Sequence, residues 1–181
     1  SRYPLLHVAC ALREDSGGPG RSRGGLSVMR RFKVQAPELT VSALADRHFV
    51  GPWGLFGGQE GGRQSFLIKQ VGDSEFRTFA EAFGVSSPTK FDNITVRQGD
   101  ELLFEAPGGG GYGDPLERAP ALVLADVQNR NVSLDAAEAA YGVKLFRQNG
   151  TLDIDAPATE TLRSQRRQAA TGASPSMASA E

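Results

Sequence analysis

Short apolar segments of β character alternate with glycine-rich stretches through the first two thirds of the chain. Strands separated by such turns are typical of antiparallel layers. The segment Arg97-Gln98-Gly99-Asp100 has the composition of a hairpin turn, because glycine tolerates the positive φ that a tight turn requires. The pattern predicts strands at residues 5–12, 26–34, 39–45, 65–68, 93–96 and 101–105. We therefore expect a mainly antiparallel β layer with Gly-rich loops.

Helical signals are found only after residue 115. Pro120 suits the first position of a helix, and the apolar residues that follow it have helical spacing, which predicts a helix at about 120–129. Ser133 and Gly142 have the residue types of an N-cap and a C′ position, so a second helix is expected at about 134–141. A third helix is predicted at 158–168.

The predicted elements indicate an α+β fold in which the β layer is followed by two or three short C-terminal helices. Residues 1–114 form the Gly-rich β region, and residues 115–168 form the helical segment. Residues 169–181 consist mainly of Ala, Ser, Thr and Gly, and we expect a disordered tail because they lack apolar content. The chain opens with Ser1 directly before a strand-like segment, which favours a start inside a domain.

The composition limits the classes of function that fit. The chain has 181 residues, 39% of them hydrophobic, with 20 Lys+Arg against 21 Asp+Glu. Such a balance lacks the basic surface that nucleic-acid binding needs, so no nucleic acid is expected as a partner. The single Cys10 favours a reducing compartment, and its apolar strand predicts a buried, unreactive thiol. No apolar run is long enough to cross a membrane, and we expect a cytoplasmic protein.

The segment 108–113 is the glycine-richest part of the chain. Gly108, Gly110 and Gly113 match GxGxxG after a predicted strand, as in a dinucleotide-binding loop. Such a loop needs its third glycine to open a helix directly, but Asp114 and Pro115 intervene. A structural loop, or one that lines another subunit's cleft, fits the pattern better. The Gly-Lys-Ser/Thr of a Walker A loop is absent from the sequence.

Few residues have the spacing of a catalytic or metal site. His7 and His48 are the only histidines and are too far apart for a ligand motif, so no metal site is expected from this chain alone. Ser16 and Ser65 match no nucleophile elbow. His48 lies in a polar segment and faces either a cleft or solvent.

Charged and aromatic loop residues offer a second group of candidates. Trp53 and Phe56 are flanked by glycines and could fill a hydrophobic seam or make a subunit contact. The charged residues form loop salt bridges or hold an anionic group; they are Asp15, Arg21, Arg23, Asp46 and Arg47. The candidate cleft or interface residues are Asp46, Arg47, His48, Trp53, Phe56, Gly108, Gly109, Gly110, Gly111, Tyr112 and Asp114.

The order of the motifs along the chain is distinctive. They are Leu12–Arg21, Arg23–Leu26, Asp46-Arg47, Pro52–Gly58 and Pro107–Arg118, followed by Leu122–Val127 and Ala139–Val143. Together they resemble the C-terminal portion of the hydantoinase B family over about residues 3–165. That family includes the B-type half of 5-oxoprolinase and subunits of ATP-dependent acetone and acetophenone carboxylases.

The resemblance implies a reaction class but no catalytic residue. Family members are much longer, and the metal-binding residues associated with catalysis lie in an N-terminal part that has no counterpart here. A hydantoinase A or 5-oxoprolinase A-type partner would bind ATP and phosphorylate a small cyclic amide, such as 5-oxoproline or a hydantoin. The B-type subunit would help to open the ring, with any divalent metal held by that N-terminal part. Phosphorylation fits this chemistry because an unstrained amide is a poor electrophile.

The resemblance therefore implies a component of an ATP-dependent cyclic amidohydrolase that is inactive by itself. Two alternatives stay open. One is a non-catalytic module for subunit assembly, and the other is part of an acetone- or acetophenone-type carboxylase subunit.

Overall fold

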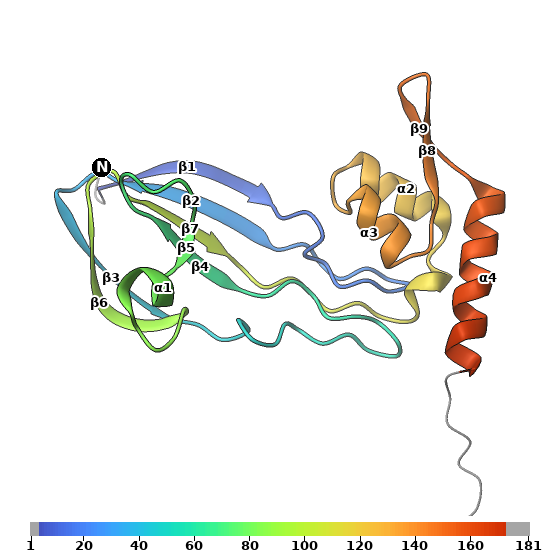
Figure 1. The fold of residues 1–181 in the computed structure, drawn as a ribbon, viewed down its shortest axis with the longest axis horizontal. Helices are drawn as coiled ribbons and strands as arrows, with labels where there is room; N and C mark the ends of the chain where they lie inside the picture. Colours follow the sequence, from blue (N-terminus) through green and yellow to red (C-terminus); the bar gives the residue numbers. More distant parts are fainter. Residues whose placement is uncertain (1–3, 173–181) are drawn as a thin grey trace, which may run out of the picture.

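The computed structural model describes residues 4–172. Its main element is an antiparallel five-stranded sheet with the strand order β1-β2-β7-β4-β5. Figure 1 shows this sheet at one end of an elongated molecule and most of the helices at the other. The strands are β1 (Leu5–Leu12), β2 (Val28–Val34), β4 (Ser65–Lys69), β5 (Arg77–Thr78) and β7 (Glu101–Glu105).

A second, two-stranded sheet covers part of one face of the first. It pairs β3 (Glu38–Leu44) with β6 (Lys90–Arg97), and α1 (Phe79–Phe83) packs beside it. Their apolar side chains meet those of the larger sheet in a buried core of Val34, Ile68, Phe79, Phe91, Val96 and Leu102. In β3 this core accounts for the alternation of apolar and polar residues, since every second side chain faces the same side of a sheet.

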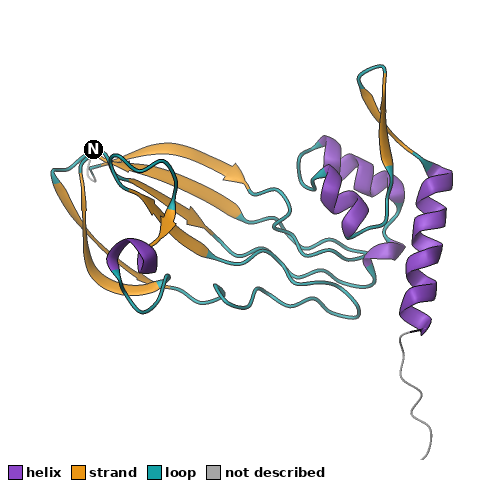
Figure 2. Cartoon of the chain, in the orientation of Figure 1, coloured by secondary structure: helices purple, strands orange, loops and turns teal. Residues whose placement is uncertain are grey.

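The helical end of the molecule has a core of its own. It contains η1 (Pro115–Glu117), α2 (Pro120–Gln128), α3 (Leu134–Ala139), β8 (Leu145–Gln148), β9 (Thr151–Ile154) and α4 (Ala156–Gly172). Its buried residues are Val123, Val127, Val132, Ala137, Tyr141 and Val143. Figure 2 shows that long loops, not helices or strands, connect this end to the sheet.

These connecting loops are the glycine-rich segments, and they bond to one another through their backbones. Gly108 N–H donates to Gly62 O at 2.8 Å, and Gly111 N–H donates to Gln59 O at 2.9 Å. Gly109 and Tyr112 donate in the same way to a third segment, at Gly25 and Ser22. In both series the donors are three residues apart, which matches the three residues per turn of a polyproline II helix.

Close backbone packing explains why these segments need glycine. A Cβ added to Gly108 would overlap the carbonyl oxygen of Ser16. Since the obstacle is main chain and not a flexible side chain, it could not move aside without disturbing its own hydrogen bonds. The loops of Figure 2 are therefore held by main-chain bonds and close contact.

The structure confirms the α+β fold with C-terminal helices. All six predicted strands are present, although β6 begins at Lys90 and not at Asn93. Pro120 opens α2, Ser133 accepts a hydrogen bond from Ala136 N–H as the predicted N-cap, and Gly142 has φ +62 just after α3. The division of the chain at residues 114 and 168 stays a prediction.

Two elements were not predicted. The expectation of helices only after residue 115 is wrong, because Thr78 and Glu81 form a capping box that starts α1. The β8–β9 hairpin lies between two predicted helices and turns at Asn149-Gly150, both with positive φ. Asn-Gly is a strong signal for such a turn, so the sequence did hold this information.

Two predictions near the ends of the chain are also corrected. Cys10 is exposed, contrary to the buried thiol expected from its apolar strand, because β1 lies at the edge of the sheet. The last helix extends to Gly172, so the start of the predicted disordered tail is helical. The rest of that tail, residues 173–181, lies outside the described residues.

Candidate functional site

The loop between β3 and β4 presents aromatic side chains to solvent. Trp53 is 65% exposed and Phe56 is 78% exposed, so neither fills a hydrophobic seam within the described residues. The guanidinium carbon of Arg47 lies 4.9 Å from the centre of the Trp53 ring, a cation–π distance. This contact orders the indole from one side and leaves most of it open.

Tyr112 extends this aromatic surface from a second segment. Its ring centre lies 5.2 Å from that of Phe56, and Leu55 N–H and Gly113 N–H tie the two segments together. We call the exposed group Phe49, Val50, Trp53, Leu55, Phe56 and Tyr112 the aromatic loop surface. Aromatic residues and arginine are enriched in protein interfaces, so this composition favours a protein contact.

His48 lies beside the aromatic loop surface and lines a small hollow. Its Nδ1 is 2.8 Å from Thr89 Oγ1, and that hydroxyl is 3.0 Å from Ala45 O. A carbonyl can only accept, so the hydroxyl gives its proton to Ala45 and accepts one from Nδ1. Nδ1 therefore carries a proton, and Nε2 is buried without a hydrogen-bond partner among the described residues.

The hollow beside His48 is too small for most ligands. It has a volume of about 190 Å³, against roughly 300–1,000 Å³ for typical ligand pockets. The ring of Phe49 lies 3.9 Å from that of His48 and forms part of the wall. His48 lines this hollow, but Asp46 does not, because Asp46 pairs with Lys90 at 2.7 Å.

A buried ionic network joins a glycine-rich segment to the helical end. Asp126 is 6% exposed and bonds to Arg118 at 2.8 Å, to both Nε and Nη2 of Arg23, and to Asn131. Burial by itself would raise the pKa of Asp126, but the hydrogen bond and charge of Arg23, helped by Asn131 and Arg118, lower it overall. The aspartate is therefore ionised at neutral pH and holds the loop against α2.

No local signal predicts this network, since Arg23 and Asp126 lie 103 positions apart. Of the five predicted loop charges, three form salt bridges within residues 4–172, namely Arg21, Arg23 and Asp46. Arg21 pairs with Glu117, and Asp15 accepts a hydrogen bond from Ser133 N–H. Tyr141 is buried beneath the network, and burial raises the pKa of its hydroxyl to about 12.

The glycine motif and Asp114 serve structure in this chain. Asp114 accepts a hydrogen bond from Leu116 N–H and caps the short helix η1, so Gly113 does not open a helix. The geometry of a dinucleotide loop is therefore not met. Gly108, Gly109, Gly110 and Gly111 pack instead against the backbones of neighbouring loops.

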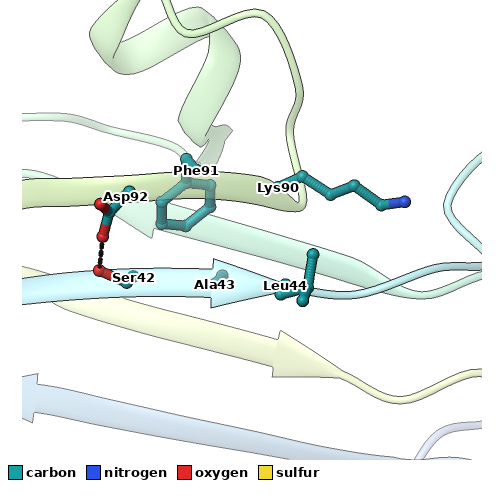
Figure 3. Close-up of a pocket in the computed structure, with 6 residues that line it drawn as sticks. All are labelled: Ser42, Ala43, Leu44, Lys90, Phe91 and Asp92. Carbon is teal, nitrogen blue, oxygen red and sulfur yellow. Dashed lines mark hydrogen bonds between the residues drawn. The ribbon is translucent and has the colours of Figure 1, made fainter.

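A shallow groove lies where β3 and β6 are irregularly paired (Figure 3). Ser42, Ala43, Leu44, Lys90, Phe91 and Asp92 line it. Ser42 Oγ donates to Asp92 Oδ1 at 2.5 Å, and Asn93 donates to the other carboxylate oxygen. These polar groups bind one another, so the groove offers no activated group for catalysis.

The described part of the chain brings together no group of three or more His, Cys, Asp or Glu residues that could hold a metal ion. No helix within residues 4–172 has the length and apolar character needed to cross a membrane. What the structure does assemble is the aromatic loop surface, which contains the predicted residues Trp53, Phe56 and Tyr112 and is flanked by Arg47.

The architecture of sheet, glycine-rich connection and helical end occurs in solved enzymes. A nucleotide-free structure of acetone carboxylase has a TM-score of 0.76 at 24% identity, over 95% of this chain and 26% of that one. The ATP-dependent caprolactamase from Pseudomonas jessenii has a TM-score of 0.68 at 27% identity, over 90% of this chain and 27% of that one. The first likeness concerns the fold alone.

The sequence comparison places the chain more narrowly. It belongs to the hydantoinase B/oxoprolinase family, whose model matches residues 1–115. The B subunit of a putative D-/L-hydantoinase from Pseudomonas sp. (strain NS671) is 33% identical over 163 residues, 90% of this chain and 26% of that protein. The chain thus spans about a quarter of the length of the relatives it matches. That relative and the caprolactamase beta chain are each named as one subunit of an enzyme.

Proposed function

We propose that this chain forms the C-terminal part of a B-type subunit that opens a cyclic amide with the help of ATP. Its partner would be an A-type subunit that binds ATP and activates the amide oxygen by phosphorylation. A hydantoin or 5-oxoproline is the substrate class that we favour. The observation that carries the proposal is the 33% identity to the B subunit of a hydantoinase over 90% of this chain.

The chain's own role in this proposal is to build and dock part of the subunit. Neither of the histidines His7 and His48 bonds to a serine or to the cysteine within residues 4–172, and the buried Asp126 at the helical end is engaged in salt bridges. Arg23 and Arg118 both bind Asp126. Substrate chemistry and any divalent cation are assigned to the part of a B-type subunit that this chain does not span.

The aromatic loop surface supplies the contact that this role requires. Trp53 and Phe56 are large, exposed and carried on loops held by main-chain hydrogen bonds. Anchors that are ordered before binding lose less conformational entropy, so they contribute more to affinity. We assign this surface to the contact with the rest of the assembly.

A chimera tests the proposal. This chain would replace the matching segment in the beta chain of Pseudomonas jessenii caprolactamase, to which it is 33% identical over 153 residues. The chimera with its partner subunit should hydrolyse ATP faster when caprolactam is present, and the chimera lacking this segment should not. An assembled chimera without lactam-stimulated turnover would contradict the proposal. Stimulated turnover by the isolated chain would contradict its assigned role.

The same chimera tests the docking role of the loop. Trp53→Ala and Phe56→Ala should each weaken assembly by about tenfold, the size expected for an aromatic anchor. Leu44→Ala is the matched control, because Leu44 is an exposed apolar residue in β3, outside the aromatic loop surface. If all three variants bind the partner subunit with equal affinity, the aromatic loop surface is not the docking contact.

Two other functions are distinguished by their requirements. A carboxylase component shares this fold with acetone carboxylase, and it would show ATP turnover that depends on bicarbonate. A purely structural module would bind the partner subunit stably. Replacing this chain in its own enzyme by the matching caprolactamase segment would then change neither the turnover rate nor the substrate of that enzyme.

A further inference from the structure

The strand β1 forms an open edge of the large sheet. It pairs with β2 on one side only, and Figure 1 shows it at the outer margin of the sheet. Its sequence is Leu-Leu-His-Val-Ala-Cys-Ala-Leu, and most of these residues are exposed, including Leu12 at 62%. An apolar edge of this length without charge is unusual in a soluble protein, because it pairs readily with other strands.

The hydrogen-bond register identifies the free backbone groups. Arg13 N–H donates to Ser27 O at 2.9 Å, so the backbone at residue 13 points toward β2. In an antiparallel pair this direction alternates along the strand. Ala11 and Ala9 therefore also face β2, while the N–H and C=O groups of Cys10 and Leu12 face outward.

The usual defences of a free edge are almost absent. Proteins block such edges with charged side chains, proline, short strands or bulges. In β1 only an irregularity between His7 and Ala9 is present, and the register from Ala9 to Leu12 is regular. The outward groups of Cys10 and Leu12 thus lie on a stretch that can accept another strand.

The strand behind this edge carries unpaired positive charge. Arg30 lies opposite Cys10, and Lys33 lies opposite Leu6. Neither cation has an ion-pair partner within residues 4–172, whereas Arg31 between them binds Glu101. Because Cys10 is small, the Arg30 side chain can extend across it toward an added strand, whose backbone would lie about 10 Å from that of β2.

We infer that the free edge of β1 receives an extended strand that carries a carboxylate on the Arg30 face. The inference rests on the proposed function, and the occupant is a segment of the B-type subunit outside this chain. About three quarters of the length of the matched relatives lies outside the matched region, which leaves ample polypeptide to supply it. A second copy of β1 fits less well, because it would bring two Arg30 and two Lys33 side chains toward one uncharged seam.

Amide hydrogen exchange of the full chain tests this inference with synthetic strands. The probe is a blocked eight-residue peptide of alternating Val and Thr with one Glu placed to pair opposite Cys10, and the matched peptide has Lys there. The Glu peptide should slow exchange of the Cys10 and Leu12 amides by about tenfold or more, and the Lys peptide should not. Arg30→Glu should reverse this preference.

A proline variant separates edge binding from folding. Cys10→Pro removes an outward N–H without breaking a bond to β2, so it should abolish peptide protection while leaving Tm unchanged. Cys10→Ser, the control, should retain protection. If Cys10→Pro lowers Tm, the reversed peptide preference of Arg30→Glu still tests whether the edge binds a strand that carries a carboxylate.

Other outcomes would overturn the inference. They are absence of protection, equal protection by both peptides, and a concentration-dependent dimer whose Cys10 and Leu12 amides are already protected. In the caprolactamase chimera the same two amides should be protected without added peptide, and free exchange there would also overturn it. The readout is amide exchange and not ATP turnover. A result that contradicts strand binding at β1 can therefore be distinguished from one that contradicts the proposed function.

Discussion

Replacing Asp126 by asparagine should destabilise the fold by about 3–5 kcal/mol, because it leaves two largely buried guanidinium groups without their counter-charge. The carboxylate accepts hydrogen bonds from Arg118 at 2.8 Å and from Arg23 at 3.2 and 3.3 Å. An asparagine keeps one acceptor oxygen and turns an N–H₂ group toward the arginines. The loss of two hydrogen bonds to charged groups, at about 1.5–3 kcal/mol each, gives about 3–6 kcal/mol, which overlaps that range.

Urea denaturation followed by circular dichroism measures this change in the free energy of unfolding. The matched control is Asp46→Asn, the same substitution in an ion pair whose aspartate is exposed, and it should change stability little. A loss below about 1 kcal/mol for Asp126→Asn would refute the reasoning, since it would mean that the network is solvated or replaceable. Equal losses for both variants would show that burial does not set the cost.

Stability measurements on Asp126, Gly108 and Tyr141 variants test three further features of the structure. The difference in the free energy of unfolding between wild type and Asp126→Asn should become smaller as pH falls below about 4. A lowered pKa stabilises the fold only while the carboxylate is ionised in the folded state. A difference that stays constant in acid denaturation curves would contradict this. Gly108→Ala should cost about 1–3 kcal/mol or more in thermal unfolding, whereas Gly25→Ala, with open space at its Cβ, should be neutral or stabilising by up to about 1 kcal/mol. Tyr141→Phe should be neutral or slightly stabilising, since the buried hydroxyl has no partner in the described structure, while Tyr141→Ala should cost about 3–5 kcal/mol; a large loss for the Phe variant would reveal a bond to that hydroxyl.

Local signals in the sequence predicted much of the secondary structure. Short apolar segments between glycine-rich stretches gave the strands, Gly99 gave the turn between β6 and β7, and Pro120 and Ser133 gave the starts of two helices. The Thr78 capping box and the Asn149-Gly150 turn are equally local, so the missed α1 and β8–β9 could have been found. The burial of Cys10 was predicted wrongly, because the composition of a strand does not reveal its place in a sheet.

The candidate site was foreseen only in part. Trp53 and Phe56 were identified as interface candidates from their glycine-flanked setting, and both are exposed in the structure. Tyr112 entered with its glycine motif, but its approach to Phe56 depends on the bridge between distant loops. The orientation of the His48 ring depends on Thr89, which lies 41 positions away and has no motif of its own.

The sequence by itself determined the family and the α+β class, because each depends on residue types in a local order. The tertiary structure alone decided which charges meet, which strand is left at the edge and which polar atoms are buried. Arg23 and Asp126 pair across 103 positions, and β1 is an edge because no strand within the described residues pairs with its other side. Such contacts are set by the packing of whole elements, and no local pattern of residues encodes which elements become neighbours.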